Sequence, residues 1–240
     1  MQNKKNNILI GTVLLVSLSG CATTEVIDER DPWEGWNRKV HSFNESLDDY
    51  AMKPIAKGYR WITPEFLDIA FTNAFSNIDD IGVFVNDALQ GKFSQSGLDF
   101  SRFLVNTTAG LGGLIDVAST VNLPKHNEDF GQTLGRWGVP TGPYLVLPLL
   151  GPSSPRGAFG LVGDAAMNPI SYLAPYISIP TNSVELTDIR ADLLDTDKTA
   201  EEASIFGKYE FYRNSYIEKR QSLVSDGAES EEDDLLFEDE

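Results

Sequence analysis

Apolar residues recur at helical spacing through most of this chain, and the pattern is clearest after Asp31. Asp31 is a favourable N-cap residue, Pro32 suits the first helical position, and Glu34 stands where a capping box places an acid. One stripe about 100° wide on this helix holds the apolar side chains of Trp33, Trp36, Val40, Phe43, Leu47 and Tyr50. This spacing indicates an amphipathic helix rather than a strand.

Proline and glycine residues divide the remaining sequence into further segments of helical spacing. We predict helix starts at Pro64, at Asn77 to Asp80, at Ser94, at Ser154-Pro155 and at Asn182 to Glu185, and a long final helix that carries Ile205, Phe206, Tyr209, Tyr212 and Tyr216. The only credible strand lies between Pro143 and Pro148, which limit it to an edge strand or a hairpin arm. The sequence therefore predicts an all-α fold with at most a short hairpin near residues 138–150.

The N-terminal residues have the pattern of an export signal. Lys4 and Lys5 precede an apolar stretch, Ile8 to Leu18, that is too short to span a bilayer. The small residues Ser19 and Gly20 then lead to Cys21, the only cysteine. This arrangement resembles a bacterial lipoprotein signal, which implies a signal peptide over residues 1–20 and lipidation of the Cys21 thiol. A plain secretory signal with an incidental cysteine is the alternative.

The residue after the cysteine is Ala22 rather than Asp, which resembles an outer-membrane address. Residues 21–31 are mostly polar and are predicted to form a lipidated tether, so the first helix stays close to the membrane. Trp33, Trp36 and Phe43 are therefore candidates to face the bilayer, where tryptophan finds partners for both its ring and its N–H. An ordinary helix that packs this stripe into a core is the alternative.

The charge balance narrows the range of partners. Of the chain's basic residues, Lys4 and Lys5 lie in the export segment, so the body carries 17 basic against 36 acidic residues. Such a chain lacks the basic surface that nucleic-acid binding requires, and anionic headgroups would repel it. The nine acids between Asp226 and Glu240 predict an acidic disordered tail over residues 225–240. A docking motif at Leu235 to Phe237 is the alternative interpretation of that tail.

Signatures of catalysis, of a metal site and of a bound cofactor are missing from the sequence. Neither His41 nor His126 belongs to an H-E-x-x-H motif, and neither a G-x-S-x-G elbow nor a P-loop occurs. Asp48-Asp49 and Asp79-Asp80 are adjacent in sequence, and we interpret them as solvated charges and caps. The sequence predicts a protein that is not an enzyme and has no cofactor, although a triad that His126 completes only in the folded chain would escape this test.

Glycines gather in the middle of the chain, and two of them, Gly138 and Gly142, bracket a proline-containing segment that leads into the apolar run Tyr144 to Leu150. Gly138 and Gly142 are candidates for a hinge that would swing this run relative to the helices. The alternative is that both glycines merely permit close packing.

An ordered series of motifs extends from residue 31 to about 156. It comprises Asp31-Pro32-Trp33-Glu34-Gly35-Trp36-Asn37-Arg38, Leu89-Gln90-Gly91-Lys92, Asn106 to Ala118, Glu128 to Gly135, Trp137-Gly138-Val139 and Gly151-Pro152-Ser153. The series resembles the MlaA/VacJ family of outer-membrane phospholipid-transport lipoproteins. Two departures are Pro140, where the family commonly has glycine, and Gly157 after Arg156, where it commonly has aspartate.

The resemblance implies a ring of amphipathic helices around a central channel, formed by residues 32–224 and lying in the periplasm-facing inner leaflet of the outer membrane. Phospholipid misplaced in the outer leaflet would pass through it to a soluble periplasmic carrier of an inner-membrane ABC transport system. Such proteins also associate with trimeric porins. Two other functions remain open: a lipid hydrolase that uses His126 or His41 as its base, and a structural lipoprotein that braces porins.

Overall fold

The computed structural model describes residues 28–197 and 207–226. Cys21, the signal segment, Ile205, Phe206 and residues 227–240 of the acidic tail lie outside the described residues. In chain order the elements are α2 (Glu34–Leu47), the π-helical turn η1 (Asp48–Met52), α3 (Lys53–Ile62), α4 (Glu65–Leu89), α5 (Phe93–Thr108), α6 (Val117–Thr120), α7 (Phe130–Arg136), β1 (Leu145–Leu147), β2 (Gly151–Ser153), α8 (Pro155–Met167), the 3-10 turn η2 (Pro169–Tyr172), α9 (Pro175–Asp192) and α11 (Lys208–Val224). The predicted all-α fold with one short hairpin is confirmed.

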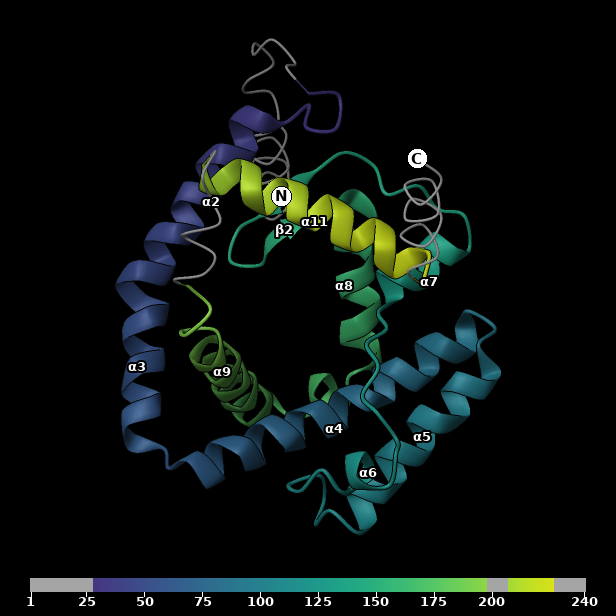
Figure 1. The fold of residues 1–240 in the computed structure, drawn as a ribbon. Helices are drawn as coiled ribbons and strands as arrows, with labels where there is room; N and C mark the ends of the chain where they lie inside the picture. The colour runs from purple at the N-terminus through teal and green to yellow at the C-terminus, as the bar shows by residue number, and fades with distance from the viewer. Residues whose placement is uncertain (1–27, 198–206, 227–240) are drawn as a thin grey trace, which may run out of the picture.

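The helices are arranged in a ring, as Figure 1 shows. From α2 the chain runs through η1 and α3 to α4, and α4 contacts α7 and α8 on the next side. The circuit closes because α7 packs on α11, α11 on β2, β2 on β1, and β1 on α2. Segments far apart in sequence therefore complete the ring, and α9 lies against both α3 and α4.

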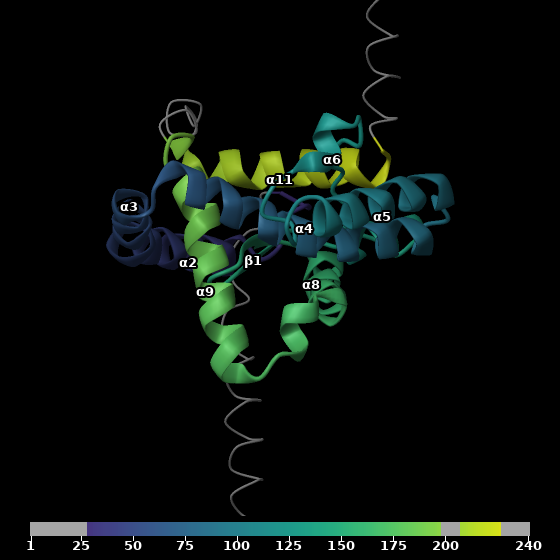
Figure 2. The same ribbon diagram turned by 90° about the horizontal axis from the view of Figure 1, so that it is seen from below.

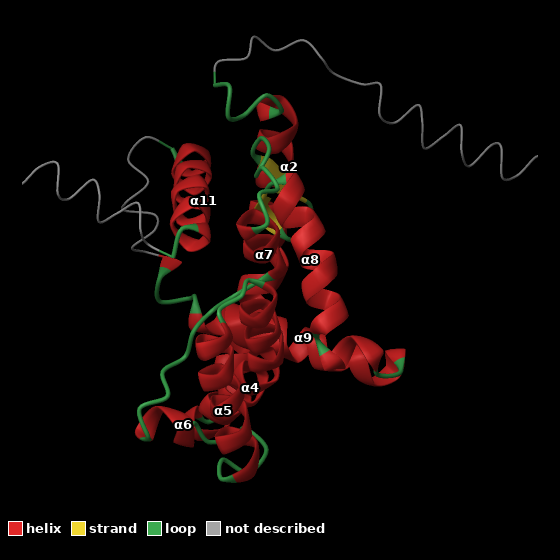
Figure 3. Ribbon diagram, turned by 90° about the vertical axis from the view of Figure 1, so that its right-hand side faces the viewer, coloured by secondary structure: helices red, strands yellow, loops and turns green. Residues whose placement is uncertain are grey.

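The two faces of the ring differ. Helices α8 and α9 extend to the same side and are joined at their far ends through η2, as Figure 2 shows. We call α8, η2 and α9 together the arm. Helices α6 and α11 lie toward the opposite face, which Figure 3 shows from the side. The arm is thus a protrusion from one face only.

The hairpin lies slightly later in the chain than the prediction placed it. Strand β1 pairs antiparallel with β2, with Val146 opposite Pro152, so the hairpin spans 145–153 rather than 138–150. A lone two-stranded hairpin is marginal in water, and two asparagines of α2 support this one. Asn37 accepts from the Val146 N–H at 2.8 Å and donates to the Tyr144 carbonyl at 3.0 Å. Asn44 makes the equivalent pair with Leu149 and Leu147.

Several predicted helix starts are wrong. Asn77 and Asp80 lie buried inside the continuous helix α4, where Asn77 donates to Thr107 at 3.0 Å instead of capping. Asn182 lies within α9, which continues past an internal proline, Pro180. Asp31 does not cap α2, because its carboxylate accepts from Asn37 at 2.7 Å. Side chains typical of caps also serve tertiary hydrogen bonds, which sequence alone does not distinguish.

Other helix boundaries follow the sequence signals. Ser154 caps α8, accepting from the Gly157 N–H at 3.0 Å, with Pro155 at the first helical position. Helix α4 begins directly after Pro64 and ends before Gly91, whose φ of +81° suits a helix C-terminus. Helix α5 begins at Phe93, one residue before the predicted start at Ser94.

Candidate functional site

The interior of the ring protein is unusually polar. Among the described residues, nine apolar side chains are buried, against fifteen polar or charged ones. The apolar set is Val40, Ala56, Val83, Ala118, Tyr144, Val146, Ile170, Ala191 and Tyr209. Soluble proteins usually show the opposite balance, since charged side chains are seldom fully buried. Hydrogen bonds and ion pairs between buried side chains therefore contribute much of what specifies this fold.

Apolar side chains lie on the outside instead. Trp61 of α3 is 87% exposed and Tyr176 of α9 is 80% exposed. Other exposed large apolar residues include Ile62, Phe66, Phe93, Leu149, Leu150, Phe159, Val162, Tyr172 and Ile179. Exposed apolar area of this extent is uncharacteristic of a monomer in water and marks contact with membrane or protein.

The side chains of the apolar stripe on α2 are divided between the surface and the buried interior. Trp33, Trp36 and Phe43 are 42%, 56% and 52% exposed, whereas Val40 of the same helix is buried. Trp36 also donates its indole N–H to the Val146 carbonyl at 3.3 Å. The three candidates named from the sequence thus lie at the surface, and the alternative of a fully core-facing stripe fails for them.

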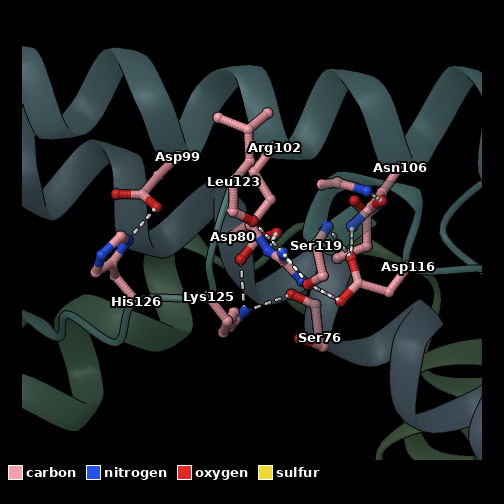
Figure 4. Close-up of polar contacts among 12 residues, drawn as sticks. Ser76, Asp80, Asp99, Arg102, Asn106, Asp116, Ser119, Leu123, Lys125 and His126 are labelled. Carbon is pink, nitrogen blue, oxygen red and sulfur yellow. Dashed lines mark hydrogen bonds and ion pairs between the residues drawn. The ribbon is translucent and has the colours of Figure 1, made fainter. Parts of the chain in front are cut away.

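A charged network joins α4 and α5, as Figure 4 shows. We call Asp80, Arg102, Asn106, Asp116 and Lys125 the α4–α5 network. Arg102 donates to Asp116 at 2.9 Å and lies 3.4 Å from Asp80, which also accepts from Lys125 at 2.5 Å. The interpretation of Asp80 as a solvated charge is wrong, since it is only 1% exposed. Burial opposes ionisation of Asp116, but hydrogen bonds from Arg102, Ser119 and Asn106 outweigh it and lower its pKa to about 2.

The histidines lie in different surroundings. His126 Nδ1 lies 3.0 Å from Asp99 and 2.7 Å from the Gln95 amide. Asp99 also neighbours Asp87, and burial together with that contact raises the pKa of Asp87 to about 7. His41 packs between the rings of Tyr209 and Tyr212, each 5.6 Å away. In the part of the chain that the structure describes, neither histidine hydrogen-bonds to a hydroxyl group.

A second polar cluster fastens α11 to α2. Asp31 is buried and accepts hydrogen bonds from Asn37 and from the Tyr209 hydroxyl. Arg213 lies 3.5 Å from Asp31 and 3.3 Å from Asp28. Asp31 and Asn37 thus help to close the ring by joining α2 to α11. The sequence pattern predicts Asp31 only as a helix cap.

The two hinge candidates differ in their surroundings. Gly138 and Gly142 have φ values of +87° and +73°, a region that favours glycine. A Cβ at Gly142 would lie 3.0 Å from the ring of Pro155, whereas one at Gly138 would meet nothing within 4 Å. Of these two glycines, only Gly142 lies where a larger residue would be too close to a neighbour, so the close-packing interpretation holds for Gly142 and not for Gly138.

Among residues 28–197 and 207–226, no three His, Cys, Asp or Glu side chains are grouped so that they could hold a metal ion. Over the same residues, no helix combines the length and apolar character needed to cross a bilayer.

The helical ring, its polar interior and its apolar exterior together define a membrane-associated helical class of protein. Comparison with known proteins narrows this class, because the family model for the MlaA lipoprotein matches residues 29–223. The chain belongs to the MlaA lipoprotein family, a family of transport lipoproteins rather than enzymes.

Relatives share most of its length. The intermembrane phospholipid transport system lipoprotein MlaA of Escherichia coli (strain K12) is 34% identical, with 95% of this chain and 91% of that protein covered. The protein of the same name from Haemophilus influenzae is 32% identical over 98% of this chain and 99% of its own. A solved structure described as "Structural basis for maintenance of bacterial outer membrane lipid asymmetry" has a TM-score of 0.71 at 34% identity, covering 81% of this chain and 98% of that one.

Proposed function

We propose that this chain is an outer-membrane lipoprotein that removes misplaced phospholipid from the outer leaflet through an amphipathic channel. It passes the lipid to a soluble periplasmic carrier, which delivers it to an inner-membrane ABC transport system, and so maintains lipid asymmetry. The observation that carries the proposal is the inverted polarity of the protein, in which polar and charged side chains are buried and large apolar side chains are exposed. Relatives named as phospholipid transport lipoproteins support it.

The same polarity supports a membrane placement, because acyl chains solvate exposed apolar side chains without the cost that water imposes. The proposal places the ring in the periplasm-facing inner leaflet, with Trp33, Trp36 and Phe43 against lipid. Lipid attached to Cys21 makes the association permanent, because several acyl chains exceed what stable anchoring needs.

Transport by such a protein needs no nucleophile, metal or nucleotide. A channel lumen requires polar groups that contact the lipid headgroup. The direction of lipid transport comes from partner proteins or from the lipid gradient. Gly138 and Gly142 are proposed as the hinge of a gate, since their positive φ values bracket the segment that leads into β1. Trimeric porins are the proposed neighbours in the membrane.

The test is a complementation assay in cells that lack the gene. Wild-type protein should lower the amount of surface phosphatidylethanolamine that a membrane-impermeant amine reagent labels. Cys21→Ser should fail to do so, because without the thiol no thioether to diacylglycerol forms.

The other functions predict different outcomes. A lipid hydrolase would release lysophospholipid or fatty acid when purified protein is incubated with phospholipid. A porin brace would leave surface phospholipid unchanged when the gene is deleted. Either result, in place of the labelling difference, would contradict the transport proposal.

A further inference from the structure

A pocket of about 550 Å³ lies between the segment at Glu29 to Pro32, the loop 141–144, the start of α8 and the C-terminal half of α11. Its lining combines apolar and cationic groups, chiefly Pro143, Ile217, Val224, Arg156 and Arg220. In a chain with a net charge of −17, this pocket is lined by three arginines, Arg30, Arg156 and Arg220, against one acid, Glu29. The arginines mark the pocket as a place for an anion.

Arg156 is buried without a counter-ion. The residue is 7% exposed, and its Nη1 donates to the Val139 carbonyl at 3.0 Å. Its Nε is buried with no hydrogen-bond partner, and within the described residues no carboxylate forms an ion pair with it. A buried arginine normally pairs with an acid, because an unpaired buried charge is costly.

The other arginines of the interior differ from Arg156. Arg220 binds both oxygens of Asp129, at 2.5 Å and 2.9 Å, and Arg102 has Asp80 and Asp116. Burial and the nearby Arg220 lower the pKa of Arg156, which Asp129 offsets only in part. An anion bound at the Arg156 guanidinium would therefore supply the counter-charge that the described residues do not place against it.

Arg156 also borders a second hollow. An apolar groove of about 560 Å³ runs between α7 and α8, with Phe130, Leu134, Phe159 and Val162 along it. Arg156 lines this groove and also the 550 Å³ pocket described above, which we call the pocket beneath α11. It stands at the second position of α8, where the positive end of the helix dipole favours an anion. The Arg156 guanidinium thus lies between an apolar groove and a pocket lined by both apolar and cationic groups. This arrangement suits an amphiphilic molecule that carries an anionic group next to an apolar chain.

We propose that Arg156 binds the phosphate group of a phospholipid, with an acyl chain along the α7–α8 groove and the remainder of the headgroup in the pocket beneath α11. This rests on the proposed function and adds to it a binding residue for the transported lipid. Because phosphate is common to all glycerophospholipids, the site accepts phosphatidylglycerol and phosphatidylethanolamine alike and rejects diacylglycerol.

The test uses the full lipoprotein in mild detergent and measures binding of dihexanoyl-phosphatidylglycerol, dihexanoylglycerol and inorganic phosphate. Loss of one charge-assisted hydrogen-bonding group should weaken binding of the phosphatidylglycerol about tenfold in Arg156→Gln. Arg136→Gln removes an exposed arginine of α7 outside the pocket and should leave binding unchanged. Arg156→Lys keeps the charge and should recover part of the affinity.

A second measurement does not depend on the variants folding. Wild-type protein is photo-crosslinked to a phospholipid with a photoreactive headgroup, and peptides from residues 141–144 or from the second half of α11 should carry the label. Equal affinity in wild type and a folded Arg156→Gln, or labelling elsewhere, would overturn the assignment of Arg156. Inorganic phosphate binding as tightly as the lipid would also overturn it, in favour of a free phosphate site. A wild-type protein that binds no phospholipid at all would instead contradict the proposed function.

Discussion

The α4–α5 pair buries more polar side chains than the arm, although both regions expose large apolar ones. Helices α4 and α5 bury Asn77, Asp80, Asn86, Asp87, Asp99, Arg102 and Asn106. The arm exposes Phe159, Val162, Tyr172, Tyr176 and Ile179. Directional hydrogen bonds specify a unique geometry for the first region, whereas the second depends on what surrounds it. The comparison indicates that hydrogen bonds and ion pairs hold α4 against α5, whereas the arm presents mainly apolar side chains at its surface.

The largest effect should follow from breaking the α4–α5 network. Arg102→Met would leave Asp80 and Asp116 without this guanidinium, and loss of one partner of a buried ion pair costs about 3–5 kcal/mol. Thermal or denaturant unfolding measures the loss. Arg60→Met, which removes the exposed pair with Asp195, should change the free energy of unfolding far less. Equal losses in the two variants would show that the packing of α4 against α5 does not depend on buried charge.

The hinge glycines should give an intermediate effect. Valine at positive φ costs about 1–3 kcal/mol, and at Gly142 contact with Pro155 adds to that strain. Gly142→Val should therefore destabilise the protein more than Gly138→Val. Melting temperatures are compared with the surface-lipid assay. Lost transport at unchanged melting temperature would support a hinge, whereas parallel losses would favour packing.

Charges on the arm should barely change stability. Tyr176→Glu places an acid at a side chain that is already exposed, so unfolding in detergent should shift by about 0.5 kcal/mol or less. Association with vesicles should weaken clearly, because acyl chains reject the carboxylate. Asn182→Glu adds the same charge at another exposed position of α9 and serves as the control. Phe43→Glu tests the surface of α2 in the same assay, and a variant that melts early would place that side chain in the core.

A further prediction concerns the dependence of stability on pH. The pKa of Asp87 rises from 3.8 to about 7 through burial and its contact with Asp99. The folded protein then binds this proton more tightly than the unfolded chain, so this group's contribution to stability falls as pH rises from about 4 to about 7. Asp87→Asn should flatten that part of the profile of unfolding free energy against pH. An unchanged profile would show that Asp87 is ionised throughout.

Local patterns in the sequence predicted more of the secondary structure than of the site. Ser154-Pro155 predicted the start of α8, and the prolines around Tyr144 predicted a short strand. The exposed positions of Trp33, Trp36 and Phe43 agree with a surface role, which the tether suggested. The predicted helix starts at Asn77 and Asn182 are wrong because both residues lie inside continuous helices. Asparagine has the same capping propensity whether or not the residues before it already form a helix.

The sequence by itself determined the helical class, the amphipathic stripes and the family, since periodicity, caps and ordered motifs are local along the chain. Only the tertiary structure decided which polar side chains are buried. Asp80 pairs with Lys125 and Asp31 accepts a hydrogen bond from Tyr209, whereas among the described residues Arg156 forms no ion pair with an acid. Burial and charge pairing depend on residues brought together across the ring, and no local pattern encodes those distances.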